Sequence, residues 1–359
     1  MSPSKPTKIL RVDAVNPDVD VLAEAAGFIR GGGLVVFPTE TVYGLGADAL
    51  NRAAVAKIFE AKGRPLDNPL IIHIAETGQL EYLTPHAGEE VFRLAEKFWP
   101  GPLTLVLRRS DKVPSEVCAG LDTVAVRMPA HPVALKLIEL SGTPIAAPSA
   151  NPSGKPSPTS GEHVIRDMTG KVDVIIDAGE TLYGVESTII DLTRAPPVLL
   201  RPGALQVEEI EAVTGGRVFV PDFARGKAEA SEAIAPGMKY RHYAPSKPLQ
   251  VIESENYADL EKYAQGVLKH VGELRSQGVR VVLLASTETL RYYSGVETLE
   301  LGSRKNLFEV ARNLYKSLRQ IDELDVDMAV TEGFEEKGLG LTIMNRLRKA
   351  SGFTIIKTA

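Results

Sequence analysis

The spacing of hydrophobic and polar residues along the first 215 positions predicts a mixture of helices and strands. Residues 18–30 place their apolar side chains at helical intervals, and Gly31-Gly-Gly33 ends that helix. Leu34-Val-Val-Phe37 is a short, continuous apolar run, which is typical of a buried strand. Because helices and strands do not alternate strictly, we expect an open, twisted α/β sheet whose strands run in mixed directions.

The other elements expected in this part follow the same two patterns. Helices are predicted over residues 51–62, 89–99, 132–140 and 206–213. Strands are predicted over residues 69–74, 103–107, 123–128, 145–148, 173–177, 187–191 and 198–201. A polar turn is expected at 39–46, and a loop rich in Pro, Gly and Ser at 149–160.

The pattern becomes more regular after residue 248. Residues 221–248 are rich in Ala, Gly, Pro and charge, which is typical of a linker. Strands and helices then alternate, and this order predicts a small parallel α/β domain of Rossmann-like type. We expect a first domain over 1–215, a linker over 216–247 and a second domain over 248–359. No G-x-G-x-x-G turn follows the first strand of the second domain, so a dinucleotide site is not predicted there.

Composition narrows the class of protein. A length of 359 residues predicts two domains, and 44% hydrophobic with 24% charged residues is typical of a soluble globular protein. A net charge of −5 argues against a strongly basic nucleic-acid footprint. Cys118 is the single cysteine, which excludes an internal disulfide and a cysteine-based zinc cluster. Without a secretory segment or a long apolar run, we expect a cytoplasmic protein with no membrane partner.

A close basic pair, Lys62 and Arg64, stands at the end of a predicted helix. One interpretation is that both charges are solvated and oppose the helix dipole. The other is a phosphate clamp, in which Arg64 forks onto phosphate oxygens and Lys62 supplies a point charge. Asn68 is close enough in sequence to add an amide to such a clamp.

Residues Thr123 and Arg127 lie four apart on a predicted strand, so their side chains share one face. An arginine on the inner face of a sheet needs an anionic partner. That partner is either an internal Asp or Glu or the carboxylate of a ligand. His73 lies on another strand among apolar residues, where it is either a core residue or a catalytic one.

Three polar segments have both a structural and a functional interpretation. Thr39-Glu-Thr41 is a strand-to-loop turn or the floor of a pocket. Ser149-Ala-Asn151 with Ser157 is an ordinary polar turn or a set of donors around a polyphosphate, although the P-loop motif is absent. Lys239-Tyr-Arg-His-Tyr243 is a solvated tether or a lid over a binding site.

An ordered series of motifs resembles the YrdC-like domain family across roughly the first 210 residues. The motifs are Pro38-Thr-Glu-Thr-Val-Tyr-Gly-Leu-Gly46, Lys62-Gly-Arg64, Asn68-Pro-Leu70, Trp99-Pro-Gly-Pro-Leu-Thr104, Val126-Arg-Met-Pro129, Ala147-Pro-Ser-Ala-Asn-Pro-Ser-Gly154, Glu186-Ser-Thr188 and Leu200-Arg-Pro-Gly203. The segment Ala235–Pro245 and the domain after it are similar to the two-domain threonylcarbamoyl-AMP synthases.

This resemblance implies an activity, its substrates and its partners. The implied nucleotidyltransferase makes L-threonylcarbamoyl-adenylate and pyrophosphate from L-threonine, bicarbonate or carbon dioxide, and ATP. Other proteins then transfer the threonylcarbamoyl group to an adenosine beside the tRNA anticodon, and a weak contact with tRNA itself is conceivable. Mg²⁺ would be carried mainly by the ATP phosphates rather than by a protein site.

The resemblance also assigns roles to individual residues. Lys62 and Arg64 would be catalytic. ATP would be bound by Arg64, Asn68, Thr123, Ser149, Asn151, Ser157, Arg201 and Tyr243. L-Threonine would be bound by Thr41, His73, Arg127, Ala147 through its backbone, and Ser187.

Two other functions stay open on the sequence. An RNA-binding module is one, although the acidic balance and the lack of aromatic-plus-basic RNA motifs count against it. A carbamoyl-transferring relative from hydrogenase maturation is the other. Such relatives usually carry zinc-finger and acylphosphatase segments, and this chain has neither.

Overall fold

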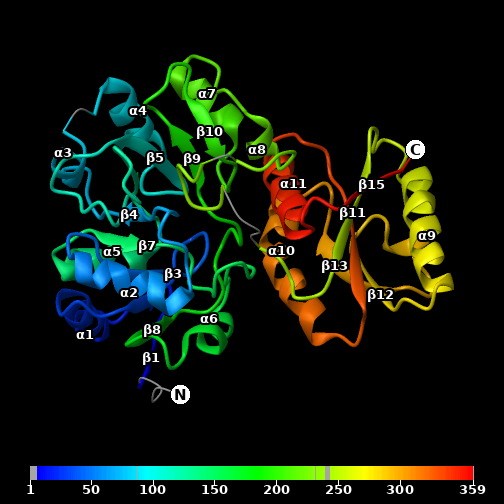
Figure 1. The fold of residues 1–359 in the computed structure, drawn as a ribbon, viewed down its shortest axis with the longest axis horizontal. Coiled ribbons are helices and arrows are strands. Elements are labelled where there is room, and N and C mark those ends of the chain that lie inside the picture. The colour runs from blue at the N-terminus through cyan, green and yellow to red at the C-terminus, as the bar shows by residue number, and fades with distance from the viewer. Residues whose placement is uncertain (1–5, 86, 231, 239–242, 359) are drawn as a thin grey trace. The chain divides into compact units, whose positions relative to one another are not determined.

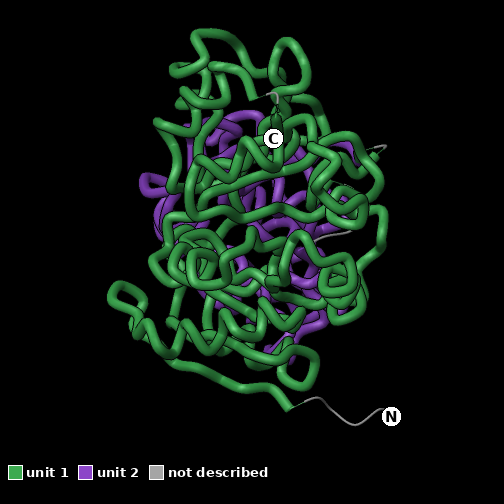
Figure 2. The backbone as a smooth tube through the Cα atoms, turned by 90° about the vertical axis from the view of Figure 1, so that its left-hand side faces the viewer, with its two compact units in different colours: residues 1–153, 157–224, 230–239 green, residues 154–156, 225–229, 240–359 purple. Residues whose placement is uncertain are grey.

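The chain divides into two compact units, coloured separately in Figure 2. The computed structural model describes residues 6–85, 87–230, 232–238 and 243–358. Unit 1 comprises residues 1–153, 157–224 and 230–239, and unit 2 comprises 154–156, 225–229 and 240–359. The region expected to be a linker is therefore shared: residues 230–238 belong to unit 1, whereas Tyr243 belongs to unit 2.

A mixed sheet organises unit 1 (Figure 1). Among the described residues it has ten strands in the order β1-β8-β2-β3-β7-β4-β6-β5-β9-β10. Their bounds are β1 Lys8–Arg11, β2 Val35–Phe37, β3 Gly44–Asp48, β4 Ile71–His73, β5 Leu103–Arg108, β6 Thr123–Arg127, β7 Ile145–Ala147, β8 Val174–Asp177, β9 Thr188–Asp191 and β10 Val198–Arg201. Parallel and antiparallel pairs both occur, which confirms the predicted mixed α/β sheet.

Helices cover this sheet. The helices are α1 Val19–Arg30, α2 Arg52–Lys62, α3 Gln79–Leu83, α4 Glu89–Phe98, α5 Pro132–Ser141, α6 Gly161–Met168, α7 Val207–Thr214 and the short α8 Asp222–Arg225. Helices α1, α2, α5 and α6 begin at side-chain caps. Asp18 and Asn51 accept hydrogen bonds from the first backbone N–H groups of α1 and α2. The apolar faces of α1 and α5 pack with β2, β7 and β8 in one core cluster.

Unit 2 is a smaller, all-parallel α/β domain, as the sequence predicted. Its strands, in the order β13-β12-β14-β11-β15, are β11 Leu249–Ser254, β12 Val281–Ser286, β13 Glu297–Gly302, β14 Met328–Glu332 and β15 Ile355–Thr358. Helix α9 Leu260–Ser276 covers one face of the sheet, and α10 Leu307–Gln320 and α11 Leu339–Ala350 lie on the other (Figure 1). Two short 3₁₀ helices, Leu290–Tyr292 and Ile321–Glu323, complete it.

The predicted turn at 39–46 ends earlier than expected, because β3 begins at Gly44. A Cβ atom on Gly46 would lie 2.7 Å from both Phe37 Cε1 and Ile145 Cγ2. Glycine is therefore required where β3 passes between these side chains of its neighbouring strands. The strands β1 and β15 and the helices α3, α6 and α8 were also not predicted from the sequence. No helix in the described part of the chain is both long enough and apolar enough to cross a bilayer.

Candidate functional site

Arg127, the last residue of β6, is the centre of a buried polar cluster in unit 1. Its Nη2 donates to Glu40 Oε1 at 2.5 Å, its Nη1 to Thr41 Oγ1 at 2.9 Å, and its Nε to the Gly101 carbonyl at 3.2 Å. The side chains of Arg127 and Glu40 are 4% and 6% exposed. Of the two partners left open by the sequence, the structure supplies the internal one, the carboxylate of Glu40.

Glu40 is the functional candidate that the sequence analysis did not assign. Its Oε2 atom is buried and has no hydrogen-bond partner among the residues that the structure describes. Sequence spacing gave no direct sign of this pairing, because Glu40 and Arg127 are 87 positions apart. The available signal was chemical: a charged residue in a turn at a strand end, where ligands often bind in α/β proteins.

His73 lies beside Arg127, since the two residues are register partners in the parallel pair β4–β6. The His73 ring meets Phe37 edge-on at 6.0 Å between centroids. Burial, reinforced by the positive charge of Arg127, lowers the pKa of His73 to about 3, so the ring is neutral at physiological pH. Its Nδ1 is buried and forms no hydrogen bond with any group in the described part of the chain.

The basic pair is divided by a sharp change of backbone direction. Helix α2 ends at Lys62, and Gly63 takes the left-handed conformation with φ 61°. Lys62 is buried, and its Nζ donates to the carbonyls of Ser149 and Asn151. Burial, with a smaller contribution from Arg64, holds the pKa of Lys62 well below its usual value. The lysine is thus directed at the backbone of the Ser149–Asn151 turn.

Arg64 points back along its own loop. Its Nε donates to the Asn68 carbonyl at 3.1 Å, and its Nη2 donates to the Pro69 carbonyl at 2.8 Å. The side-chain Oδ1 of Asn68 is buried, and no described group forms a hydrogen bond with it. Arg64 and Asn68 therefore form one local unit before β4, with an amide oxygen still unused.

The Ser149–Asn151 turn follows β7 and is tied internally. Ser149 Oγ donates to Asn151 Oδ1 at 2.6 Å. Ala147 is the register partner of Ile71 in β4, and Ser149 pairs with Gly44 in an isolated bridge. The turn is therefore held at the same end of the sheet as the Arg64–Asn68 loop.

Ser187 and Arg201, two further predicted site residues, are also in direct contact. The Arg201 guanidinium donates to the Ser187 carbonyl at 3.0 and 3.2 Å and to Ser187 Oγ at 3.2 Å. Thr104 Oγ1 lies 2.7 Å from Ser187 Oγ. Arg201 also donates to the Pro236 carbonyl at 3.3 Å, which ties part of the expected linker to unit 1.

Two further predicted site residues of unit 1, Thr123 and Ser157, lie on β6 and beside Glu186. Thr123 begins β6 and, four positions before Arg127, shares a face with it. Ser157 is buried, and its hydroxyl donates to Glu186 Oε1 at 2.6 Å, next to Ser187 in the chain.

Tyr243 is described within unit 2, whereas Lys239, Tyr240, Arg241 and His242 lie outside the described residues. Tyr243 has φ 65°, which is unusual for a residue other than glycine. Its ring stacks on Tyr315 at 5.4 Å, and the Arg346 guanidinium lies 4.9 Å from its centroid. Unit 2 thus holds the last residue of the expected lid segment.

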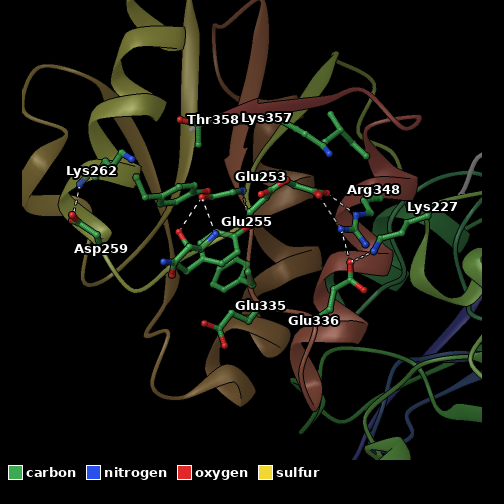
Figure 3. Close-up of a pocket in the computed structure, with 16 residues that line it drawn as sticks. Lys227, Glu253, Glu255, Asp259, Lys262, Glu335, Glu336, Arg348, Lys357 and Thr358 are labelled. Carbon is green, nitrogen blue, oxygen red and sulfur yellow. Dashed lines mark hydrogen bonds and ion pairs between the residues drawn. The ribbon is translucent and has the colours of Figure 1, made fainter.

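A cleft of about 1200 Å³ occupies the carboxyl edge of the unit 2 sheet (Figure 3). It lies between the loops that follow the adjacent strands β11 and β14, whose helices cover opposite faces. Arg348 bonds Glu253 at 2.6 Å and Glu336 at 2.8 Å, and Lys227 bonds Glu336 at 2.8 Å. Because its lining carries both signs of charge and several of these charges pair together, the cleft favours no single class of ligand.

The comparisons with known proteins cover both units. Residues 27–203 match the Sua5/YciO/YrdC family model, described as telomere recombination, and residues 205–352 match the C-terminal domain model of threonylcarbamoyl-AMP synthase. The chain is 57% identical to the Pyrococcus abyssi threonylcarbamoyl-AMP synthase over 93% of this chain and 94% of that one. It is 48% identical to the Bacillus subtilis threonylcarbamoyl-AMP synthase over 96% and 97% of the two chains.

A solved structure agrees with these sequence matches. The crystal structure of P. abyssi Sua5 complexed with L-threonine superposes with a TM-score of 0.90 at 53% identity, over 99% of this chain and 100% of that one. Agreement over both units confirms the predicted resemblance, and the chain belongs to the Sua5/YciO/YrdC family in its two-domain form.

Proposed function

We propose that this protein makes L-threonylcarbamoyl-adenylate and pyrophosphate from L-threonine, bicarbonate and ATP. Relatives that match nearly the full chain are threonylcarbamoyl-AMP synthases, and one was solved with L-threonine. The observation in this chain that carries the proposal is the buried Arg127 cluster, which gathers Thr41, His73 and an unsatisfied carboxylate around one guanidinium.

The chemistry resides in the substrates. The threonine amine attacks the carbon of bicarbonate, and water leaves to give a carbamate. A carbamate oxygen then attacks the α-phosphorus of ATP while pyrophosphate leaves. This route needs positioning and neutralisation of charge but no protein nucleophile. Cys118 is unsuited to that role, because burial raises the pKa of its thiol to about 12.

Threonine would occupy the Arg127 cluster. Arg127 binds the substrate carboxylate, and neutral His73 accepts a hydrogen bond through the nitrogen that is unpartnered in the free protein. Thr41 and Ser187 supply hydroxyl groups, and Ala147 supplies its backbone. These assignments follow the family resemblance and agree with the burial of each side chain.

ATP would lie along the Arg64–Asn68 loop and the Ser149–Asn151 turn. Arg64 exchanges its carbonyl partners for phosphate oxygens, and Asn68, Thr123, Ser149, Ser157, Arg201 and Tyr243 supply further contacts. Lys62 contributes by holding the turn that carries Ser149 and Asn151, since its ammonium is directed at their carbonyls. Within the described residues no cluster of three His, Cys, Asp or Glu side chains is suited to a metal. As the family resemblance implies, Mg²⁺ would be carried mainly by the ATP phosphates.

The test is a direct search for the product. Purified protein is mixed with ATP, Mg²⁺, bicarbonate and L-threonine, and the adenylate is sought by mass spectrometry together with released pyrophosphate. We expect both products only when threonine is present. Equal pyrophosphate release without threonine, or a carbamoyl-adenylate lacking the threonine mass, would exclude the proposal and favour a carbamoyl-transferring relative.

The product is an activated carbonyl compound for a separate transfer to tRNA. We propose that partner proteins consume it and that direct tRNA contact is weak, in line with the net charge of −5. Mixing the protein with tRNA at increasing salt measures that contact.

A further inference from the structure

Arg127 is already paired in the free protein. Glu40 Oε1 takes one of its N–H groups at 2.5 Å, and both side chains are almost completely buried. A substrate carboxylate that bound Arg127 alone would bring a second negative charge beside Glu40. The site therefore needs a second positive charge if it is to hold the substrate without net charge in its interior.

The second oxygen of Glu40 indicates where this second positive charge would bind. Oε2 is buried and accepts no hydrogen bond from any described group. Buried carboxylate oxygens are normally hydrogen-bonded, so an orphan oxygen next to a substrate-binding arginine indicates a donor that arrives with the ligand. L-Threonine carries such a donor, its α-ammonium group, separated by a single carbon from its carboxylate.

We propose that Glu40 binds the α-ammonium of L-threonine through Oε2, so that the Arg127–Glu40 pair recognises both charges of the amino acid. This inference rests on the proposed function. Arg127 and the substrate carboxylate form one ion pair, and Glu40 and the ammonium form the other, so four charges alternate in sign. Glu40 is then a specificity-determining residue that excludes hydroxy acids with the same carboxylate and hydroxyl groups but no amine.

The contact between Glu40 and the ammonium group should affect substrate binding more than the chemical step. Once the nitrogen becomes a carbamate it no longer carries a positive charge, so the contact with Glu40 is strongest in the substrate complex. Loss of Glu40 should therefore raise the KM for threonine more than it lowers kcat.

The experiment compares two ligands on two proteins by isothermal titration calorimetry. The ligands are L-threonine and (3R)-3-hydroxybutanoate, which lacks only the amino group. Wild type should bind threonine far more tightly than the hydroxy acid. Glu40→Gln should weaken threonine binding about 10- to 100-fold. It should not weaken hydroxybutanoate binding, because the substitution removes the negative charge that repels the carboxylate of the hydroxy acid.

The outcomes separate this inference from the proposed function. If wild type fails to bind threonine, the proposed function fails. If Glu40→Gln weakens the binding of both ligands equally, Glu40 only orients Arg127. If it weakens the binding of neither ligand, Glu40 does not contact the substrate. Either result overturns the inference. Glu96→Gln, on the exposed face of α4, is the matched control. Unchanged ATP binding and thermal unfolding of Glu40→Gln show that the fold is retained, and Glu40→Asp provides a second variant if it is not.

Discussion

Each unit contains a buried arginine–carboxylate pair near a strand end, and the two pairs differ in how completely they are satisfied. In unit 2, Glu332 is fully buried and accepts bonds from Arg304, from the backbone and hydroxyl of Ser286, and from the Tyr293 hydroxyl. In unit 1, Glu40 has one oxygen bonded to Arg127 and one unpartnered. A saturated pair stabilises a fold, whereas an unsaturated one can accept a ligand.

The largest effect is expected when Arg127, the arginine of the incompletely bonded pair in unit 1, is removed. Arg127→Ala should lower kcat/KM for threonine about 1000-fold, because the substrate carboxylate loses its buried cation. Pyrophosphate release at varied threonine measures the effect. Arg11→Ala, an exposed site, serves as the control. Activity within tenfold of wild type would contradict the role given to Arg127.

Removing Arg304, the arginine of the fully bonded pair in unit 2, should affect the stability of the fold rather than the reaction. Arg304→Met leaves the Glu332 carboxylate buried without its cation and should lower the free energy of unfolding by about 3 kcal/mol. Denaturant unfolding measures the loss. Adenylate synthesis, assayed well below the unfolding temperature, should stay within about twofold of wild type. A large loss of activity in folded protein would show that this pair also serves the reaction.

Lys62 provides a further test within unit 1, because its Nζ donates to the backbone carbonyls of Ser149 and Asn151 rather than to a carboxylate. Lys62→Met removes both hydrogen bonds to the Ser149–Asn151 turn and should weaken ATP binding about tenfold. Threonine binding should be unchanged. Calorimetry with each ligand separates the two, and an equal loss of both would contradict a role confined to the turn.

His73 should affect the dependence of stability on pH in the absence of either substrate. Its folded pKa of about 3 lies below its ordinary value of 6.5, so the unfolded chain binds the proton first as pH falls. Stability should therefore decline between about pH 6.5 and pH 3, by no more than about 1.4 kcal/mol per pH unit from this group. His73→Asn should remove that part of the slope. An unchanged slope would show that His73 is not buried and neutral.

The sequence predicted the elements whose residues form a clear local pattern of apolar and polar positions. Apolar runs located β2, β5, β6 and β8, and the ordered motifs identified the family. It did not predict β3, because Gly44-Leu-Gly-Ala-Asp48 has low strand propensity and is held by its neighbours. Helix α6 is short and begins with glycine after a Pro-rich loop, which hides its periodicity.

The partners of charged side chains were the least predictable part of the site. Arg127 and Lys62 were identified as important, yet Glu40 lies 87 positions from Arg127, and the Ser149 and Asn151 carbonyls lie 87 and 89 positions from Lys62. Spacing along one strand fixes the face on which a side chain lies. Which carboxylate or carbonyl faces it depends on the register of the whole sheet.

Gly46 has an effect that extends beyond its own strand. A side chain there would displace Phe37, whose ring edge supports the imidazole of His73. Substitution at this position would thus alter amino-acid recognition without touching the amino acid. A residue with no side chain beyond hydrogen thus keeps Phe37 in place beside the histidine proposed to bind threonine.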